Sequence, residues 1–583
     1  MNTNQFKEAT IGNQREQNVL ERYLPLFLGG FVFAVYIRTM APGIYWGDGI
    51  ELATVCATGG IAHPTGYPLF TIAGWIFSHL FGGNPALGTN LMCAFFGAAG
   101  AAFFYLALKS ALRILPGEYF LRSGYRTILA ASIALFFSFS RTMWFHSTIT
   151  EVYSLHILFT CVLFYFFFQY MLKSGKGYFP GFFLIWGLSF SNHMLSLILF
   201  PLAASMIVTR LKKGGGIKSI VPAVLLFFAG LLPYLYLPLR AASRPELNWG
   251  DPSNLENFIW VISGGEFKKH QFLMERPGVP FTLSTFSFHA FNRFREFALW
   301  IAGEGSFLSP YATGMKKLLF SLFALSGAFG AGILLNKKKP LGIAIVSMLF
   351  LGFCMIFLYN IPDIEAYFLS LYPALLILIL IGAIHILHLL EKALFSRKIN
   401  YLHLLILFLP ILAVKGNYSP QDKSGNTDAM TYGLRILRHC PENAMIITFG
   451  DNDIYTLWYL QKALQLRPDL TIVGSNFIHN GWYSRYFEDK LPGKPEITIR
   501  GTETPPSRGD FFLDLMLWVI EPNIDRFPVL LTSMDPLLIE MYDVKSLGNT
   551  LDRSMYERAP WSYLPDPGLF RIYRRESKKE PKE

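Results

Sequence analysis

Residues 45–69 read YWGDGIELATVCATGGIAHPTGYPL, and they directly follow the first strongly apolar segment of the chain. Two carboxylates, Asp48 and Glu51, lie three residues apart just past that segment, and His63 follows in a turn rich in proline and glycine. Unpaired charges rarely lie this close to lipid, because each costs several kcal/mol there. We therefore expect the chemistry of the protein in this stretch, and its position relative to the membrane decides the fold.

The composition indicates a polytopic membrane protein. Hydrophobic residues make up 52% of the 583 residues and charged residues only 16%, against roughly 25% charged residues in soluble domains. Residues 1–22 are mostly polar, so we expect a cytoplasmic N-terminal tail and no cleavable signal peptide. The five cysteines show no spacing typical of a disulfide framework or a zinc site.

Apolar segments of about 20 residues predict about eleven membrane spans. They lie near residues 23–40, 86–108, 127–140, 151–172, 178–192, 194–209, 219–239, 313–335, 341–359, 367–390 and 401–414. The lysines and arginines behind the net charge of +11 gather in short loops between these spans. The basic loops share one side if the N-terminus is cytoplasmic, as the positive-inside rule requires. This distribution argues against a nucleic-acid partner.

Residues 64–82 are nearly long enough to cross the bilayer, and they test this topology. If they crossed, the later basic loops would change sides. We therefore interpret them as a re-entrant or interface-lying helix within a first external loop, residues 41–85. The same alternation places residues 240–312 outside as a long loop, within a transmembrane catalytic domain that covers residues 23–414.

Residues 415–583 have fewer apolar residues and more charge, and we expect them to form an external soluble α/β domain. Residues 444–450, 470–476 and 527–533 are typical of buried strands, and residues 453–464 of an amphipathic helix. The last ten residues, RRESKKEPKE, are predicted to be disordered because they offer almost no apolar surface to bury.

Asp48 and Glu51 share one face if the segment after Trp46 is helical. They could then act as a general base and its electrostatic partner, or hold a divalent cation. The pattern D-x-x-E is also that of a helix capping box with Asp48 at the N-cap, and the two interpretations can coexist. His63 is either a substrate contact or a structural residue of its turn.

Two further groups of polar residues lie at the predicted external ends of spans. The first consists of Arg141, His146, Glu151 and Tyr153, with Asn192 and His193 in the next external turn. Arginine, histidine and carboxylate at one membrane edge favour a ligand pocket, although a glutamate at a helix start is also stabilised by the helix dipole. The second group consists of Arg240, Arg244, Trp249 and Asp251.

Arg240 and Arg244 could bind phosphate, because a guanidinium offers a planar fork to phosphate oxygens. An arginine near the end of a span can instead extend its charge to the membrane interface. In the C-terminal domain, Asp451 or Asp453 could bind sugar hydroxyls or a cation, but we favour a helix N-cap role.

An external carboxylate pair, external arginines and many spans predict an enzyme that uses a lipid-linked donor at the external leaflet. No P-loop, H-E-x-x-H, G-x-S-x-G or dinucleotide motif occurs in the sequence. The non-enzyme alternative is a transporter or flippase. That function would predict inverted repeats and broken helices near the bilayer midplane, whereas the polar residues here gather at one external face.

Several segments resemble one family. WGDGIEL, AHPTGYPLF, NPALGTNLMCAFFGAAGA, SFSRTMWFHSTITEVYSLH, LSFSNHM, LPYLYLPLRA with NWGDP, and FGDNDIYTLWYLQ are similar to the protein O-mannosyltransferase-like family, glycosyltransferase family 117, of the GT-C membrane glycosyltransferases. The resemblance covers the first eight predicted spans and, more thinly, the C-terminal domain. It implies an α-helical polytopic GT-C fold followed by the soluble α/β domain.

The resemblance also implies transfer of a sugar, commonly mannose, from polyprenyl phosphate to a protein Ser or Thr hydroxyl. Asp48 would be the general base with Glu51 supporting it, and Arg240, with Arg141 or His193, would hold the donor phosphate. A lipid or glycan acceptor is the alternative. No metal is required, although a divalent cation at Asp48 and Glu51 is compatible with the residues. We expect a bacterial inner-membrane protein with a periplasmic C-terminal domain.

Overall fold

The computed structural model describes most of the chain. The described residues exclude 1–2, 81, 115–122, 174, 176, 271–282, 305–312, 360, 362–363, 395–401, 481, 484–513, 534–535, 550–567 and 576–583. Within the described part, seven helices are long and apolar enough to cross a membrane. The chain is therefore a multi-pass membrane protein. The end of the tail predicted to be disordered lies outside the described residues.

The chain divides into two compact units, each assembled from separate segments. The helical unit contains residues 1–40, 91–235 and 266–424. The mixed unit contains residues 41–90, 236–265 and 425–583. The mixed unit thus combines the predicted first external loop, the start of the predicted second loop and the C-terminal α/β segment.

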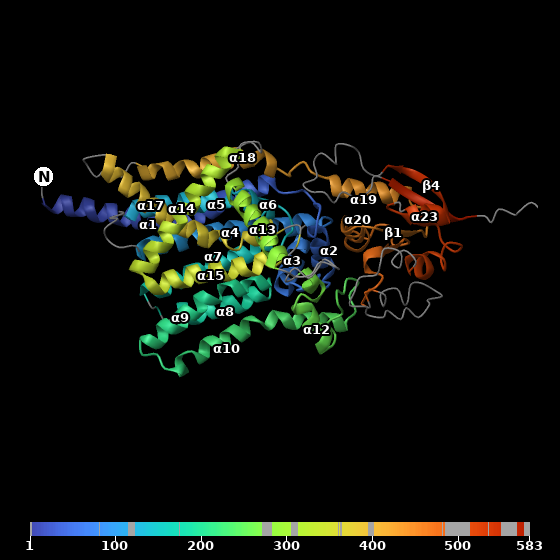
Figure 1. Ribbon diagram of the computed structural model, residues 1–583, viewed down its shortest axis with the longest axis horizontal. Helices are drawn as coiled ribbons and strands as arrows, with labels where there is room; N and C mark the ends of the chain where they lie inside the picture. The colour runs from blue at the N-terminus through green and yellow to red at the C-terminus, as the bar shows by residue number, and fades with distance from the viewer. Residues whose placement is uncertain are drawn as a thin grey trace, which may run out of the picture. The chain divides into compact units, whose positions relative to one another are not determined.

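The helical unit consists of α-helices, most of them long and apolar, that pack against one another (Figure 1). They are α1 (Thr3–Thr39), α4 (Pro85–Ile114, all but its start), α5 (Ser123–Ser138), α6 (Arg141–His146), α7 (Tyr153–Lys173), α8 (Tyr178–Phe190), α9 (Phe200–Lys212), α10 (Val221–Gly230), α13 (Leu283–Gly303), α14 (Thr313–Lys337), α15 (Lys339–Phe357), α16 (Glu365–Phe368), α17 (Tyr372–Leu394) and α18 (Phe408–Gln421).

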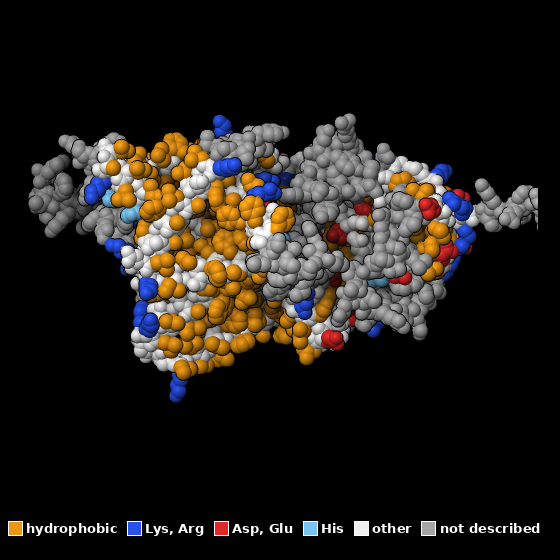
Figure 2. Space-filling view, in the orientation of Figure 1, with side chains coloured by type: hydrophobic (Ala, Val, Ile, Leu, Met, Phe, Trp, Pro, Cys, Tyr) orange, Lys and Arg blue, Asp and Glu red, His pale blue; other side chains and the backbone are white. Residues whose placement is uncertain are grey.

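Glycines allow the closest helix contacts in this unit. A Cβ added to Gly382 of α17 would collide with the carbonyl oxygen of Ser326 of α14, and one added to Gly330 would collide with that of Leu378. Small residues let helix backbones approach in this way inside a bilayer. Large apolar side chains such as Leu225, at 63% exposure, and Phe350, at 70%, face outward. Figure 2 shows the hydrophobic surface that such residues form over these helices, as contact with lipid requires.

The predicted long external loop, residues 240–312, is only partly a loop. α13 (Leu283–Gly303) lies within it and packs against α14 and α15 of the helical unit. One aromatic residue of α13, Phe297, contacts Phe353 of α15 with ring centroids 4.9 Å apart. The second predicted external loop therefore ends in the mixed unit near residue 265.

Two short helices lie in the first predicted external loop, α2 (Gly49–Thr58) and α3 (Pro68–Leu80), and they pack against each other. α3 has 13 residues, fewer than the roughly 20 that a membrane-crossing helix needs. The interpretation of residues 64–82 as a helix that does not cross the bilayer is consistent with this length. Two more short helices, α11 (Tyr236–Ala242) and α12 (Leu255–Ile262), lie in the middle segment of the mixed unit, residues 236–265.

A five-stranded sheet with the order β2-β1-β3-β5-β4 forms the C-terminal part of the mixed unit. Its strands are β1 (Met445–Thr448), β2 (Thr471–Gly474), β3 (Val529–Leu531), β4 (Tyr542–Asn549) and β5 (Gly568–Arg574), and its helices are α19 (Asp428–His439), α20 (Asp451–Trp458) and α23 (Pro536–Met541). β1 pairs in parallel with β2 and β3, whereas β5 is antiparallel to β3 and β4. Figure 1 shows α19 and α20 beside these strands.

The three predicted strands are β1, β2 and β3, and the predicted helix after the first strand is α20 with a following turn of π-helix, Tyr459–Ala463. The prediction missed β4 and β5. β5 ends at Arg574, where the disordered tail was expected to begin. Its polar residues are tolerated because β5 is held by strands on both sides, a constraint that depends on pairing between distant segments.

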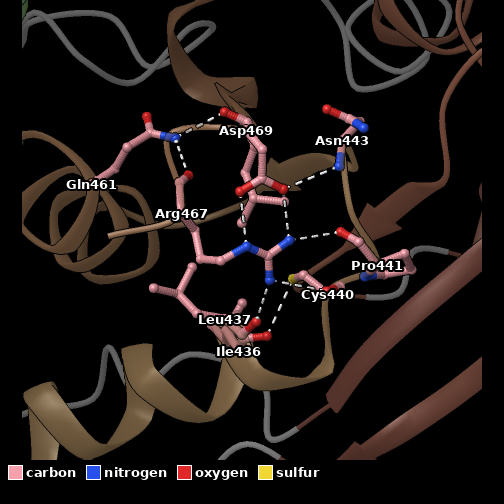
Figure 3. A network of polar contacts seen from close by, with 9 residues as sticks. Ile436, Leu437, Cys440, Pro441, Asn443, Gln461, Arg467 and Asp469 are labelled. Carbon is pink, nitrogen blue, oxygen red and sulfur yellow. Dashed lines mark hydrogen bonds and ion pairs between the residues drawn. The ribbon is translucent and has the colours of Figure 1, made fainter. Parts of the chain in front are cut away.

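Arg467 connects the starts of β1 and β2 with the end of α19 (Figure 3). Its guanidinium donates two hydrogen bonds to the Asp469 carboxylate, at 2.8 and 2.7 Å, and others to the carbonyl oxygens of Leu437, Cys440 and Pro441. The same carboxylate accepts a bond from the Asn443 backbone N–H. The Arg467 guanidinium lowers the pKa of Asp469 to about 2.

Replacing Arg467 by alanine is expected to lower the free energy of unfolding of this part of the mixed unit by about 2 kcal/mol, because carbonyl oxygens at the end of α19 lose charged donors. The contribution of Asp469 is present above its unfolded pKa of 3.8 and is lost as pH falls toward about 2, since the folded pKa is depressed. Thermal unfolding of the detergent-purified protein measures the effect. Lys545→Ala, at an exposed lysine of β4, is the control, and equal midpoints for both variants would contradict the prediction.

Candidate active site

Asp48 lies at the N-terminus of α2, but it does not cap the helix. Its backbone is already helical, with φ −61° and ψ −20°, and its side chain makes no capping hydrogen bond. Among the residues that the structure describes, none donates a hydrogen bond to its carboxylate. The capping-box interpretation of Asp48 and Glu51 is therefore wrong. Both carboxylate oxygens of Asp48 can therefore accept a proton or a hydrogen bond from a substrate.

Glu51 and His63 form a buried hydrogen-bonded contact instead of a capping box. Glu51 is fully buried, and its carboxylate accepts a bond from the His63 backbone N–H at 3.1 Å and lies 2.9 Å from His63 Nδ1. The Tyr67 hydroxyl lies 3.2 Å from His63 Nε2 on the other side of the ring. A carboxylate on Nδ1 fixes the tautomer and orientation of an imidazole. Sequence reasoning missed Tyr67, which stands four residues after His63.

The surroundings of Asp48 favour its protonated form. Burial among protein atoms raises its pKa most, and the negative charges of Asp451 and Glu51 raise it further, whereas the positive charge of His63 lowers it. Solvent nevertheless reaches Asp48, which is exposed. Both observations fit a carboxylate that has protein on several sides and remains open to a ligand. A raised pKa brings a carboxylate closer to the working range of a general base.

Trp249 lies beside His63, with ring centroids 6.2 Å apart, and also contacts Trp482 at 4.7 Å. It is held there by a bridge between Ile61 and Asn248, which joins the first predicted loop to the second. Asn248 in turn donates a bond to Asp251 at 3.1 Å. The structure thus brings predicted residues Trp249 and His63 together, and Asp251 supports the turn that carries Trp249.

Arg240 lies at the C-terminal end of α2. Its Nε donates to the Gly59 carbonyl oxygen, and its Nη2 donates to that of Thr58 at 3.2 Å. Gly59 ends the helix in the left-handed conformation, with φ +62°, as is common after the last helical turn. A cation there also interacts favourably with the helix dipole. Arg240 is thus a fixed, half-buried cation, and Arg244 nearby in the sequence is exposed.

A second cluster of predicted residues lies in the helical unit. Tyr153 contacts the rings of His146 and His193, with centroid distances of 4.8 and 5.6 Å. Two residues absent from the prediction join it: Tyr367 lies 5.8 Å from His193, and His156 lies 5.6 Å from it. Burial and the nearby Lys423 charge lower the pKa of His146 to about 3, so this imidazole is neutral at ordinary pH.

Two other predicted residues of this group, Asn192 and Glu151, make hydrogen bonds that involve the backbone. Asn192 donates to the Val152 carbonyl oxygen at 3.1 Å. The backbone N–H and carbonyl groups of Glu151 both contact the Cys93 thiol at 3.4 Å. Arg141 is exposed at the start of α6. Glu151 and Asn192 are thus close in sequence to Tyr153 and His193 of the ring cluster, and Arg141 begins the helix that ends at His146.

Glu304 is a functional candidate that sequence reasoning missed. It is buried, and its carboxylate accepts bonds from the Thr142 hydroxyl at 2.6 Å and the Thr142 backbone N–H at 3.1 Å. These bonds hold the first turn of α6, which carries Arg141. Burial raises the pKa of Glu304 to about 7 against the opposing effect of the Thr142 bonds. A lone glutamate 162 residues from its partner in the chain gives no local signal.

A metal site is not evident in the part of the chain that the structure describes. No group of three or more His, Cys, Asp or Glu residues is arranged there to hold an ion. Both carboxylate oxygens of Glu51 face His63. A divalent cation shared by Asp48 and Glu51 would therefore have to displace His63 from Glu51.

Two regions of the chain match models of one protein family. Residues 48–214 match the family model described as the protein O-mannosyl-transferase TMEM260 N-terminal domain, and residues 429–502 match TMEM260-associated domain 2. The first match begins at Asp48 and includes His193. The second includes α20, so the first and the last of the three segments of the mixed unit each contain residues that match a TMEM260 model.

Two curated relatives are named as protein O-mannosyl-transferases. TMEM260 of Mus musculus is 29% identical over 489 residues, which cover 79% of this chain and 64% of the mouse protein. The tmem260 protein of Dictyostelium discoideum is 26% identical over 492 residues, which cover 77% of this chain and 56% of that protein. The match thus spans less than two thirds of the length of either relative.

Among solved structures, ArnT from Cupriavidus metallidurans bound to undecaprenyl phosphate has a TM-score of 0.50. The superposition covers 96% of this chain and 98% of ArnT, at 12% sequence identity. At this level of identity the likeness concerns the fold alone. The predicted fold class, a polytopic α-helical protein of the GT-C type, is confirmed.

Proposed function

We propose that this chain, which resembles protein O-mannosyl-transferases in sequence and ArnT in fold, is a membrane glycosyltransferase with Asp48 as its general base. The donor is a polyprenyl-phosphate-linked sugar, mannose in the first instance, and the acceptor is a Ser or Thr hydroxyl of a protein. The observation that carries this proposal is the Asp48 carboxylate, which has no hydrogen-bond donor among the described residues and lies at the N-terminus of α2 beside the Glu51–His63–Tyr67 chain.

The proposed reaction is a direct displacement. The acceptor oxygen forms a bond to the anomeric carbon of the sugar as its proton moves to Asp48, and the bond from that carbon to the phosphate oxygen breaks. The electron pair of the broken bond remains on the polyprenyl phosphate. A carboxylate whose pKa is raised by burial holds the transferred proton more firmly than an ordinary aspartate does.

Negative charge develops on the departing phosphate, and a fixed cation there lowers the barrier. We assign this role to Arg240, because its bonds to the α2 carbonyl oxygens hold the guanidinium in place before a donor binds. Asp48 lies at the opposite end of α2, so this role requires the donor to extend along the helix, with its sugar near Asp48 and its phosphate near Arg240.

ArnT was solved with undecaprenyl phosphate, which supports a polyprenyl phosphate as the leaving group here. The names of the curated relatives support a protein acceptor. By the alternation of basic loops, we place the N-terminus in the cytoplasm and the mixed unit on the opposite side of the membrane. The mouse and Dictyostelium relatives are eukaryotic, and the bacterial inner membrane stays a prediction.

Purified protein in detergent is expected to add a hexose to a Ser- and Thr-containing peptide when supplied with polyprenyl-phosphate mannose, and to add none from a nucleotide-linked mannose. Mass spectrometry of the peptide measures the transfer. A parallel incubation with polyprenyl-phosphate mannose and membrane lipids tests the other acceptor class. If only lipid were labelled, the acceptor would be a lipid and not a protein. Transfer from nucleotide-linked mannose in the absence of lipid would contradict the proposed donor.

A further inference from the structure

The residue before the proposed base is held by the C-terminal segment of the chain. The backbone N–H of Gly47 donates to the side-chain oxygen of Asn452 at 2.8 Å, across 405 residues of sequence. Both residues belong to the mixed unit. Gly47 has φ +101°, a conformation that residues with a side chain rarely adopt. The bond therefore fixes a special backbone conformation directly next to Asp48.

A second contact holds the same short segment. The ring of Trp46 lies 5.6 Å from that of Tyr432 on α19. The Tyr432 hydroxyl donates to Asp453 at 2.6 Å, and Asp453 also accepts a bond from Thr532. These residues are buried. α19, α20 and the sheet thus form one connected support for residues 46 and 47, and Asp453 belongs to that support rather than to a helix cap.

Asp451 brings a negative charge close to the base. It stands in the first turn of α20, which packs against α2, and its charge is one of those that raise the pKa of Asp48. The groups that act on Asp48 are thus His63 and Glu51 from the first predicted loop and Asp451 from α20. His63 opposes the two carboxylates.

We propose that the turn Gly450–Asp453, the GDND turn, is part of the catalytic centre, with Asn452 as a positioning residue for Asp48 and Asp451 as the residue that tunes its charge. This inference rests on the proposed function of Asp48. It assigns the C-terminal segment a role in the chemical step, in addition to any role in acceptor binding. The geometry that carries it is the Gly47–Asn452 bond together with the packing of α20 against α2.

A purely structural contact would predict lower stability in variants of the turn but no movement of the pH profile. Two substitutions that alter charge in opposite directions separate these cases. Asp451→Asn removes a negative charge, and the acid limb of the profile of kcat is expected to move to lower pH. Asn452→Asp keeps an oxygen that can accept the Gly47 bond and adds a negative charge, so the acid limb is expected to move to higher pH.

Asn452→Ala removes the acceptor of the Gly47 N–H and is expected to lower kcat up to about tenfold, as loss of one hydrogen bond allows. KM for the donor should stay unchanged. Asp543→Asn, at an exposed aspartate of β4 in the same unit, is the matched control and should leave both the profile and kcat as they are. Asp451→Glu should restore the profile of the parent protein.

A readout that needs no sugar transfer separates this inference from the proposed function. The carboxyl absorption of Asp48 is the infrared band that is lost in Asp48→Asn, and its pH midpoint can be followed in each variant. Opposite shifts of this midpoint in Asp451→Asn and Asn452→Asp support the inference even if no donor is used. Unmoved midpoints and an unmoved profile in both variants would overturn it.

Discussion

Asp48→Asn is expected to lower the rate of sugar transfer by roughly 10³-fold or more, within the range that general-base catalysis contributes. Asparagine has nearly the same shape as aspartate but cannot accept a proton at neutral pH. Because no described residue donates a hydrogen bond to the Asp48 carboxylate, the substitution removes the base without breaking a structural contact. The measurement is the initial rate of hexose transfer from polyprenyl-phosphate mannose to peptide.

The control for this variant is its stability. Its thermal unfolding midpoint in detergent should match or exceed that of the parent protein, since the native environment raises the pKa of Asp48 and so disfavours its charged form. In the parent protein, activity should fall as pH decreases through a value above the ordinary aspartate pKa of 3.8, because protonated Asp48 cannot act as a base. An asparagine variant that transfers sugar at the parental rate would show that the base is another residue.

Glu51→Gln is expected to lower kcat by roughly 10²-fold and the free energy of unfolding by about 2 kcal/mol, since charged hydrogen bonds within a buried contact are lost. Glutamine can accept only one of the two bonds that His63 now donates, and its amide N–H₂ would oppose the Nδ1–H of the ring. The histidine would then lose its fixed tautomer and its place between Glu51 and Tyr67. Single-turnover rates and thermal unfolding measure the two effects.

Glu246→Gln is the matched control for Glu51→Gln. Glu246 also pairs with a cation of the mixed unit, the buried Lys462 at 3.1 Å, but its own side chain is 55% exposed and does not contact His63. This variant should keep the parental kcat. If Glu51→Gln lowered stability while leaving kcat unchanged, the Glu51–His63–Tyr67 chain would be only a structural contact.

Much of the secondary structure could be predicted from local patterns. Buried strands at residues 444–450, 470–476 and 527–533 are recognisable because they are short apolar runs followed by polar turns. The 13-residue α3 was expected not to cross the membrane, because a crossing would have reversed the later basic loops. β4 and β5 were missed because their stability comes from pairing across the sheet rather than from their own composition.

Sequence reasoning named many residues of the candidate site, but it did not predict the contacts that they make. Asp48, Glu51 and His63 stand out as polar residues in an apolar chain, and Tyr153 was correctly grouped with His146 and His193. The capping box failed because a local pattern competes with tertiary contacts: Glu51 is fully buried, and its carboxylate bonds His63 instead of the helix N-terminus. Glu304 and Tyr367 could not be found, since their partners lie far away in the sequence.

The amino-acid sequence by itself determined the membrane class, the alternation of basic loops and the position of the carboxylates, because hydrophobicity and charge act on each segment separately. Only the tertiary structure decided which carboxylate faces a histidine and which remains open to a substrate. It also placed Asn452 beside Gly47, 405 residues away. Burial and charge depend on what several distant segments place around one side chain, and no local pattern contains that information.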